Sequence, residues 1–245
     1  TTNRDSLNSV TIEDTTFEDS SGQDVLDVLL ANEEALTLEN IEVRGSSGSG
    51  DINLDTTKAE ESVTLNDVGG STNTSFGVPG LDLQGSTTTV TALTLEGTGS
   101  ESELRVVDSG NNLETLNLTG DASLDVTNAG ITSLETVDAT GMEADDEGDT
   151  PGVTVTFGAD ADVTITGGAG DDTIEMSGDF DDKDVLDGGD GTDTLFVSQS
   201  GTLGDFDASN FEALAVASNG IDSNRTLDVD GIEGIETVNV LGVNS

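Results

Sequence analysis

The chain has 245 residues, of which 51 are acidic and 6 are basic, so its formal net charge is −45. A surface of that sign repels phosphate, which argues against a nucleic-acid binder. Histidine, cysteine, tyrosine and tryptophan are absent, so the usual general base, every thiol and the favoured zinc ligands are missing, and we expect no catalytic activity. Leucine, isoleucine, valine and phenylalanine make up about 25% of the residues, which is enough apolar content for the chain to fold.

The N-terminal segment, residues 1–44, mixes strand-like and helix-like patterns. We expect strands there, but Gln23–Ala35 is rich in helix formers, so an amphipathic helix is the alternative for that stretch. The run Gly45–Gly50 follows and has the composition of a linker. It predicts either a domain break or a long loop.

Apolar and polar residues then alternate with a period of two in short segments along the chain. A period of two is typical of a strand with one buried face. We therefore expect residues 51–166 to form a ladder of strands. The segments, including one in the N-terminal part, are Leu36–Leu38, Val63–Leu65, Leu81–Leu83, Leu93–Leu95, Leu116–Leu118, Leu124–Val126, Val153–Val155 and Val163–Ile165.

The chain also repeats itself. Leu113–Gly120 recurs 21 residues later as Leu134–Gly141, with five of eight positions identical. A shorter apolar-Glu-x-apolar unit occurs at Phe211–Leu214 and, 24 residues later, at Ile235–Val238. Such a unit buries its apolar side only by stacking on its neighbours, so the period predicts an all-β, elongated parallel β-solenoid or β-roll with about 21–24 residues per coil. The glutamate of the unit is expected to point into solvent, with a role as a ligand as the alternative.

Two nonapeptides fit the pattern G-G-x-G-x-D-x-U-x, in which U is a large apolar residue: Gly167–Glu175 and Gly188–Phe196. Glycines allow a tight turn with converging carbonyl oxygens, the aspartate adds a carboxylate, and the apolar residue anchors the next strand. One nonapeptide makes half a coil, and a degenerate half-repeat lies between these two. The two turns should therefore stack on the same side of the roll, with one calcium ion between them. Residues 167–196 are thus expected to form a calcium-binding roll, and residues 197–245 further solenoid coils.

The calcium ligands would come from these two turns, with Asp172 and Asp193 as the carboxylates. The full set of candidate ligands is Gly167, Gly168, Ala169, Gly170, Asp172, Gly188, Gly189, Asp190, Gly191 and Asp193. A degenerate half-repeat lies between the two nonapeptides, and a second site on the opposite side of the roll would use Asp179, Asp181, Asp182 and Asp184. The acidic run Glu143–Asp149 is typical of a solvated loop, with an additional calcium loop or an intersubunit bridge as the alternative.

The two nonapeptides resemble those of the RTX family of secreted, calcium-binding β-roll proteins. The strand-rich stretch Ser133–Gly168 looks like the lattice region of bacterial S-layer proteins of the RTX type. The resemblance implies type I secretion, calcium-triggered folding outside the cell, and a structural role at the cell surface. It also implies that copies of the chain join into a lattice or filament through calcium bridges. The chain departs from that family in its extreme acidity and in having only two and a half nonapeptides.

We therefore expect a structural cell-surface protein, a calcium-dependent, self-assembling S-layer-type subunit or a segment of one. Two alternatives stay open: a repeat or stalk module of a secreted RTX adhesin, and the calcium-binding, non-catalytic tail of an exported enzyme. The acidic excess itself favours salty or calcium-rich water, because screening or divalent cations reduce self-repulsion. No stretch approaches the 18 apolar residues of a membrane span, so none is expected.

Overall fold

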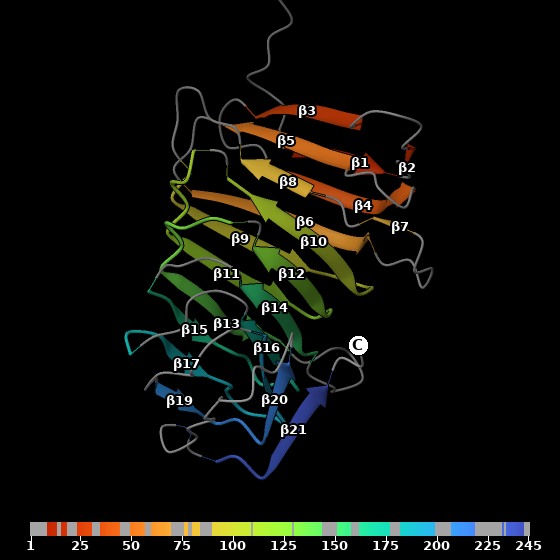
Figure 1. Cartoon of the computed structure of the whole chain (residues 1–245). Helices are drawn as coiled ribbons and strands as arrows, with labels where there is room; N and C mark the ends of the chain where they lie inside the picture. The colour runs from red at the N-terminus through yellow and green to blue at the C-terminus, as the bar shows by residue number, and fades with distance from the viewer. Residues whose placement is uncertain are drawn as a thin grey trace, which may run out of the picture.

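The protein is a stack of short strands that runs from one end of the molecule to the other (Figure 1). Its described part contains 21 strands and no helix. The computed structural model describes residues 9–13, 16–18, 24–30, 35–44, 50–56, 60–69, 76–77, 80–83, 90–108, 110–128, 130–143, 151–157, 162–176, 182–198, 207–218, 232 and 234–242.

Two sheets make up the stack, and all but one of the strand pairings are parallel. The first sheet runs, in order, β1 (Ser9–Glu13), β4 (Ala35–Arg44), β6 (Glu60–Val68), β9 (Ala92–Gly97), β11 (Thr115–Gly120), β13 (Thr136–Met142), β15 (Thr164–Thr166), β17 (Val185–Asp187) and β19 (Asp207–Ser209), with β2 (Thr16–Glu18) and the antiparallel β7 (Phe76–Gly77) paired to β4. The second sheet runs β3 (Asp24–Leu30), β5 (Gly50–Thr56), β8 (Gly80–Leu83), β10 (Ser102–Val107), β12 (Leu124–Asn128), β14 (Val153–Phe157), β16 (Thr173–Met176), β18 (Thr194–Val197), β20 (Ala213–Ser218) and β21 (Thr237–Gly242).

From β8 to β20 the chain alternates between the two sheets, so each coil gives one strand to each sheet. The distance in sequence between paired residues is therefore the length of one coil. It ranges from 19 residues between Thr154 and Thr173 to 32 residues between Glu60 and Ala92. The predicted parallel β-solenoid is confirmed, and insertions at the corners lengthen individual coils beyond the predicted period.

The sequence repeats lie one coil apart. Leu116 of the first long copy is opposite Val137 of the second, and the copies carry the two adjacent strands β11 and β13. In the shorter unit, Leu214 is opposite Val238 on β20 and β21. The internal similarity thus reflects the same inward position in successive coils.

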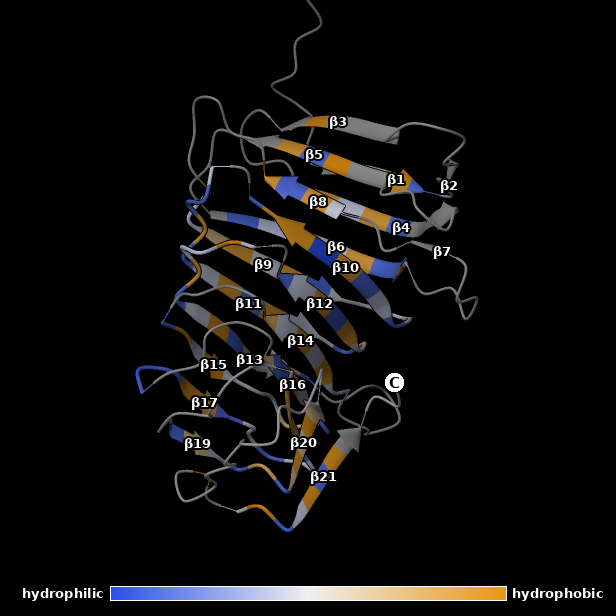
Figure 2. Cartoon of the chain, in the orientation of Figure 1, coloured by the Kyte–Doolittle hydropathy of each residue, from blue (hydrophilic) through white to orange (hydrophobic). Residues whose placement is uncertain are grey.

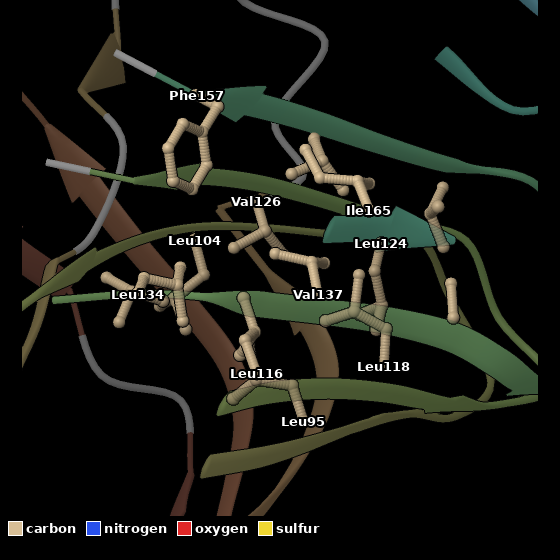
Figure 3. Packing of buried hydrophobic residues seen from close by; sticks show 14 of the residues in the cluster. Leu95, Leu104, Leu116, Leu118, Leu124, Val126, Leu134, Val137, Phe157 and Ile165 are labelled. Carbon is tan, nitrogen blue, oxygen red and sulfur yellow. The ribbon is translucent and has the colours of Figure 1, made fainter. Parts of the chain in front are cut away.

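The core lies between the sheets and follows the stack. Leu93 and Leu95 in β9 have no exposed surface, whereas Thr94 between them is half-buried, and Figure 2 shows the same alternation along other strands. Burying one such side chain contributes about 1.5–3 kcal/mol. Figure 3 shows side chains from both sheets meeting in this core, among them Leu95, Leu116, Val137 and Ile165 from the first sheet and Leu104, Leu124, Val126 and Phe157 from the second.

The helical alternative for residues 23–35 is wrong. Asp24–Leu30 forms β3, and Ala35 already belongs to β4. Leu26 is opposite Ile52 and Val28 is opposite Leu54, and both partners are buried. Pairing with the next coil overrides the local helix preference, because a strand here extends the buried row of the sheet.

The sheets continue across all three domain boundaries expected from the sequence. β4 pairs with β6 across residues 44–51, and β15 pairs with β17 across residue 167. The boundary at residue 197 falls within β18, whose Val197 is opposite Val216 of β20. Within the described ranges, no helix has the length and apolar character needed to span a bilayer.

Candidate functional site

The two predicted glycine turns lie at one corner of the stack, which we call the glycine corner. It consists of Gly167–Asp172, between β15 and β16, and Gly188–Asp193, between β17 and β18. The Asp190 amide donates a hydrogen bond to the Gly168 carbonyl at 3.0 Å. A Cβ placed on Gly189 would come within 2.2 Å of that same carbonyl oxygen. The turns are therefore stacked in contact, and glycine is required because the backbones approach so closely.

The two turns differ in backbone conformation although they share one sequence pattern. Gly189 and Gly191 have φ angles of 99° and 146°, whereas Gly168 and Gly170 do not adopt positive φ. The Gly168 amide donates to its own turn's aspartate, but the Gly189 amide donates to Asp187 Oδ1 at 3.2 Å. The turn in which this glycine has positive φ is thus also the turn in which its amide donates to Asp187 and not to the turn's own aspartate.

Asp172 is buried and uses both of its carboxylate oxygens. Oδ1 accepts a hydrogen bond from the Val153 amide of the preceding coil at 2.7 Å, and Oδ2 accepts one from the Gly168 amide at 2.6 Å. Burial raises the pKa of Asp172, while the two backbone hydrogen bonds act in the opposite direction. In this arrangement the carboxylate joins two coils through backbone amides.

Asp193 is equally buried, at 1% exposure, but only one of its oxygens has a hydrogen-bond partner. Oδ1 accepts from the Asp172 amide at 2.7 Å, whereas Oδ2 is buried without any partner. Burial raises the pKa of Asp193 to about 6, and the nearby carboxylates of Asp172 and Glu212 add to the rise. A buried, unpaired carboxylate oxygen is costly unless a cation or a proton reaches it.

Glu212 takes the same structural position in the next coil. Its Oε2 accepts a hydrogen bond from the Asp193 amide at 2.8 Å, so it is half-buried rather than fully in solvent. The sequence signal is its place two residues before the inward Leu214, as Asp193 precedes Leu195. The other described glutamates of the repeated units are exposed, as predicted, namely Glu114, Glu135 and Glu236.

The predicted second site lies at the opposite corner. Asp184 is buried there, and its Oδ1 accepts a hydrogen bond from the Val163 amide of the preceding coil at 3.0 Å. Asp182 is exposed, while Asp179 and Asp181 lie outside the described residues. The adjacent Lys183 forms an ion pair with Asp162 at 2.9 Å. Among the described residues, Asp182 and Asp184 belong to no group of three acidic side chains that could hold a metal ion.

At the glycine corner, Asp193 Oδ2 is the carboxylate oxygen without a hydrogen bond, so it is the atom that could bind a divalent cation. Among the described residues, no three carboxylates converge into a group that could hold a metal ion. Both oxygens of Asp172 already accept amide hydrogen bonds, and Ala169 and Asp190 are exposed on the outside of the turns. Because calcium takes six to eight oxygen ligands, carbonyl oxygens and water would have to complete the shell around Asp193.

Carboxylates also crowd the outer face of the second sheet. Glu103 in β10 is directly opposite Asp125 in β12. Burial raises the pKa of both, and Glu101 adds to the rise in each case. The face is therefore strongly acidic where neighbouring strands align like charges.

Comparison with protein-family models, with curated proteins and with solved structures finds no match to this chain.

Proposed function

We propose that the protein is a structural cell-surface component, a calcium-stabilised subunit of an S-layer-type assembly. The observation that supports it best is the stacked glycine corner with Asp193 Oδ2 buried and unpaired between coils. The fold is compatible with this role, since a solenoid offers long acidic sides for contacts with neighbouring copies. The lack of histidine, cysteine and tyrosine also favours a structural role over a catalytic one.

Bound at the glycine corner, a calcium ion would supply the positive charge that Asp193 lacks. Asp193 would hold it through Oδ2 while Oδ1 keeps its hydrogen bond to the Asp172 amide. Asp172 would fix the geometry of the turns by tying Val153 to Gly168. A ligand that binds only the folded state stabilises it, by about 2.7 kcal/mol at one hundred times its Kd.

The test is thermal unfolding with calcium and with a chelator. For the wild type we expect calcium to raise Tm by about 5–10 °C. Asp193→Asn keeps an acceptor for the Asp172 amide but removes the charge, so it should lose most of that rise. Asp121→Asn is the matched control, because Asp121 is an exposed carboxylate between β11 and β12 at the same corner. An equal calcium response in all three proteins would contradict the site.

Electron microscopy tests the assembly. We expect sheets or filaments in calcium that dissolve on chelation. Assemblies that persist without calcium, or their absence in calcium, would count against the S-layer role.

A stalk module of a secreted adhesin is the second candidate, and the repetition of one strand unit in successive coils favours it. Such a module would bind calcium in the same way but would stay monomeric. Sedimentation in calcium therefore separates the two candidates.

A further inference from the structure

The residue before the double glycine differs between the two turns of the glycine corner. Thr166 precedes Gly167, and Asp187 precedes Gly188. Thr166 and Asp187 are opposite each other on β15 and β17, so they occupy the same position in successive coils. One turn therefore follows a neutral hydroxyl, and the other follows a carboxylate.

The amide of the second glycine in each turn follows this difference. After Thr166, the Gly168 amide donates to Asp172 Oδ2 at 2.6 Å. After Asp187, the Gly189 amide donates to Asp187 Oδ1 at 3.2 Å, and Gly189 has positive φ. An ionised carboxylate is a stronger hydrogen-bond acceptor than a hydroxyl. Asp187 can thus take an amide that Thr166 leaves to the turn's own aspartate.

Asn210 of the following coil holds the Asp187 carboxylate in place. Its side-chain Nδ2 donates to Asp187 Oδ1 at 2.6 Å. The two coils are also joined next to this contact, because the Gly188 amide donates to the Ser209 carbonyl at 3.0 Å. One oxygen of Asp187 therefore accepts a hydrogen bond from its own turn and another from the next coil, which fixes the direction of the carboxylate.

Asp193 Oδ2 is the atom that this arrangement leaves without a donor. Its counterpart in the first turn, Asp172 Oδ2, accepts the Gly168 amide. A Cβ placed on Gly188 would come within 2.8 Å of Asp193 Oδ2, so this oxygen lies against the backbone of its own double glycine. It is nevertheless buried without a hydrogen bond. The oxygen is close to the glycines but receives no amide from them.

We infer that Asp187 is a positioning residue that decides which of the two turns binds a cation. By accepting the Gly189 amide, Asp187 keeps Asp193 Oδ2 available for calcium, whereas the turn after Thr166 satisfies its own carboxylate. This inference rests on the proposed calcium site and names the residue that selects it. Asp187 Oδ1 itself accepts two amide hydrogens, so it acts through the backbone rather than as a ligand.

Asp187→Thr tests the inference, because it gives the second turn the residue that the first turn has. We expect the Gly189 amide to donate to Asp193 Oδ2 in this variant. Calcium chloride should then bind at least about tenfold more weakly in isothermal titration calorimetry, the factor expected for one hydrogen bond to a charged group. Asp187→Ser gives the same test with a smaller side chain and matches Ser209, which is opposite Asp187 in the next coil.

Two variants separate this role from a loss of charge. Asp187→Asn keeps an acceptor for both amides, so calcium affinity should stay within about threefold of the wild type. Asp138→Thr is the matched control, since Asp138 is opposite Thr166 and removes one charge from the same row outside the glycine corner. It should bind calcium like the wild type. Unchanged affinity in Asp187→Thr, or an equal loss in Asp187→Asn or Asp138→Thr, would overturn the inference.

Crystal structures in chelator test the direction of the amide without calcium. The wild type should keep the Gly189 amide on Asp187, and Asp187→Thr should place it on Asp193. A Gly189 amide that still points away from Asp193 in the variant would refute the role of Asp187. Circular dichroism confirms that each variant is folded.

The two proposals fail in different ways. A wild type that binds no calcium would refute the calcium-stabilised subunit, and the structures in chelator would still decide whether Asp187 directs the amide. Calcium binding that is equally tight in wild type and Asp187→Thr would refute the role of Asp187 and leave the proposed function standing.

Discussion

Asp172 and Asp193 occupy the same position of the same nonapeptide, yet they differ by one hydrogen bond. In the first turn, the Gly168 amide satisfies Asp172 Oδ2. In the second turn, Gly189 has positive φ and its amide donates to Asp187 instead, which leaves Asp193 Oδ2 unpaired. The chemistry of the corner thus depends on the direction of a single backbone amide.

The raised pKa of Asp193 predicts a pH dependence in the absence of calcium. The folded-state pKa of about 6 exceeds the ordinary value of 3.8, so folding favours the protonated form. The stability that this group contributes is therefore fully present below about pH 4 and is lost as pH rises towards 6. Urea unfolding of wild type and Asp193→Asn in chelator measures it. We expect the difference in unfolding free energy between the two proteins to change across this window, and a constant difference would contradict the assignment.

Glu212 yields a second prediction at this scale. Glu212→Ala removes the acceptor for the buried Asp193 amide and should lower the unfolding free energy by about 1–3 kcal/mol. Glu212→Gln retains an acceptor and should cost less. Glu236→Ala, in the same repeated unit but exposed, is the control and should change stability by about 0.5 kcal/mol or less. Chemical denaturation gives all three values, and equal losses for Glu212→Ala and Glu236→Ala would argue against the hydrogen bond.

Single strands of this fold are too short to be stable alone, since β15, β17 and β19 contain three residues each. Each strand is held by backbone hydrogen bonds to the coils on either side and by an inward apolar residue. Leu186 of β17, for example, is opposite Ile165 of β15 and Ala208 of β19, and all three are buried. Stability at the level of the element therefore belongs to neighbouring coils together.

Leu95 in β9 tests this coupling. It has no exposed surface and is opposite Val63 in β6 and Leu118 in β11. Leu95→Ala should lower the unfolding free energy by about 2–5 kcal/mol, because the cavity lies between two coils. Glu114→Ala, at an exposed position next to β11, should be nearly neutral. Thermal or urea unfolding measures both, and a small loss for Leu95→Ala would mean that the coils pack loosely.

For the whole molecule, the net charge of −45 opposes compaction, and either screening or bound cations can relieve it. Screening by salt and binding of calcium predict different outcomes. In chelator and low salt we expect reduced strand content by circular dichroism, with 1 M NaCl restoring it equally in wild type and Asp193→Asn. A few millimolar calcium at low salt should restore it in the wild type alone. An equal response of both proteins to calcium would show that calcium acts only through general charge.

The strand alternation, the coil period and the position of both glycine turns could be predicted from the sequence, because each depends on a local pattern that every coil repeats. Leu116 and Val137 show this directly, since their matching positions in the repeat become opposite positions in the sheet. The strand at Asp24–Leu30 could not be predicted with the same clarity, because this stretch is rich in helix formers and only its pairing with β5 makes it a strand.

The site itself depended on the tertiary structure. Identical nonapeptide positions gave no reason to separate Asp193 from Asp172, and a repeated glutamate gave no reason to separate Glu212 from Glu236. Burial and the direction of neighbouring amides separate them, and both arise only when coils are stacked. Val238 and Val240 show the same dependence: their alternation in the sequence is that of inward residues, and only the structure shows that both are exposed.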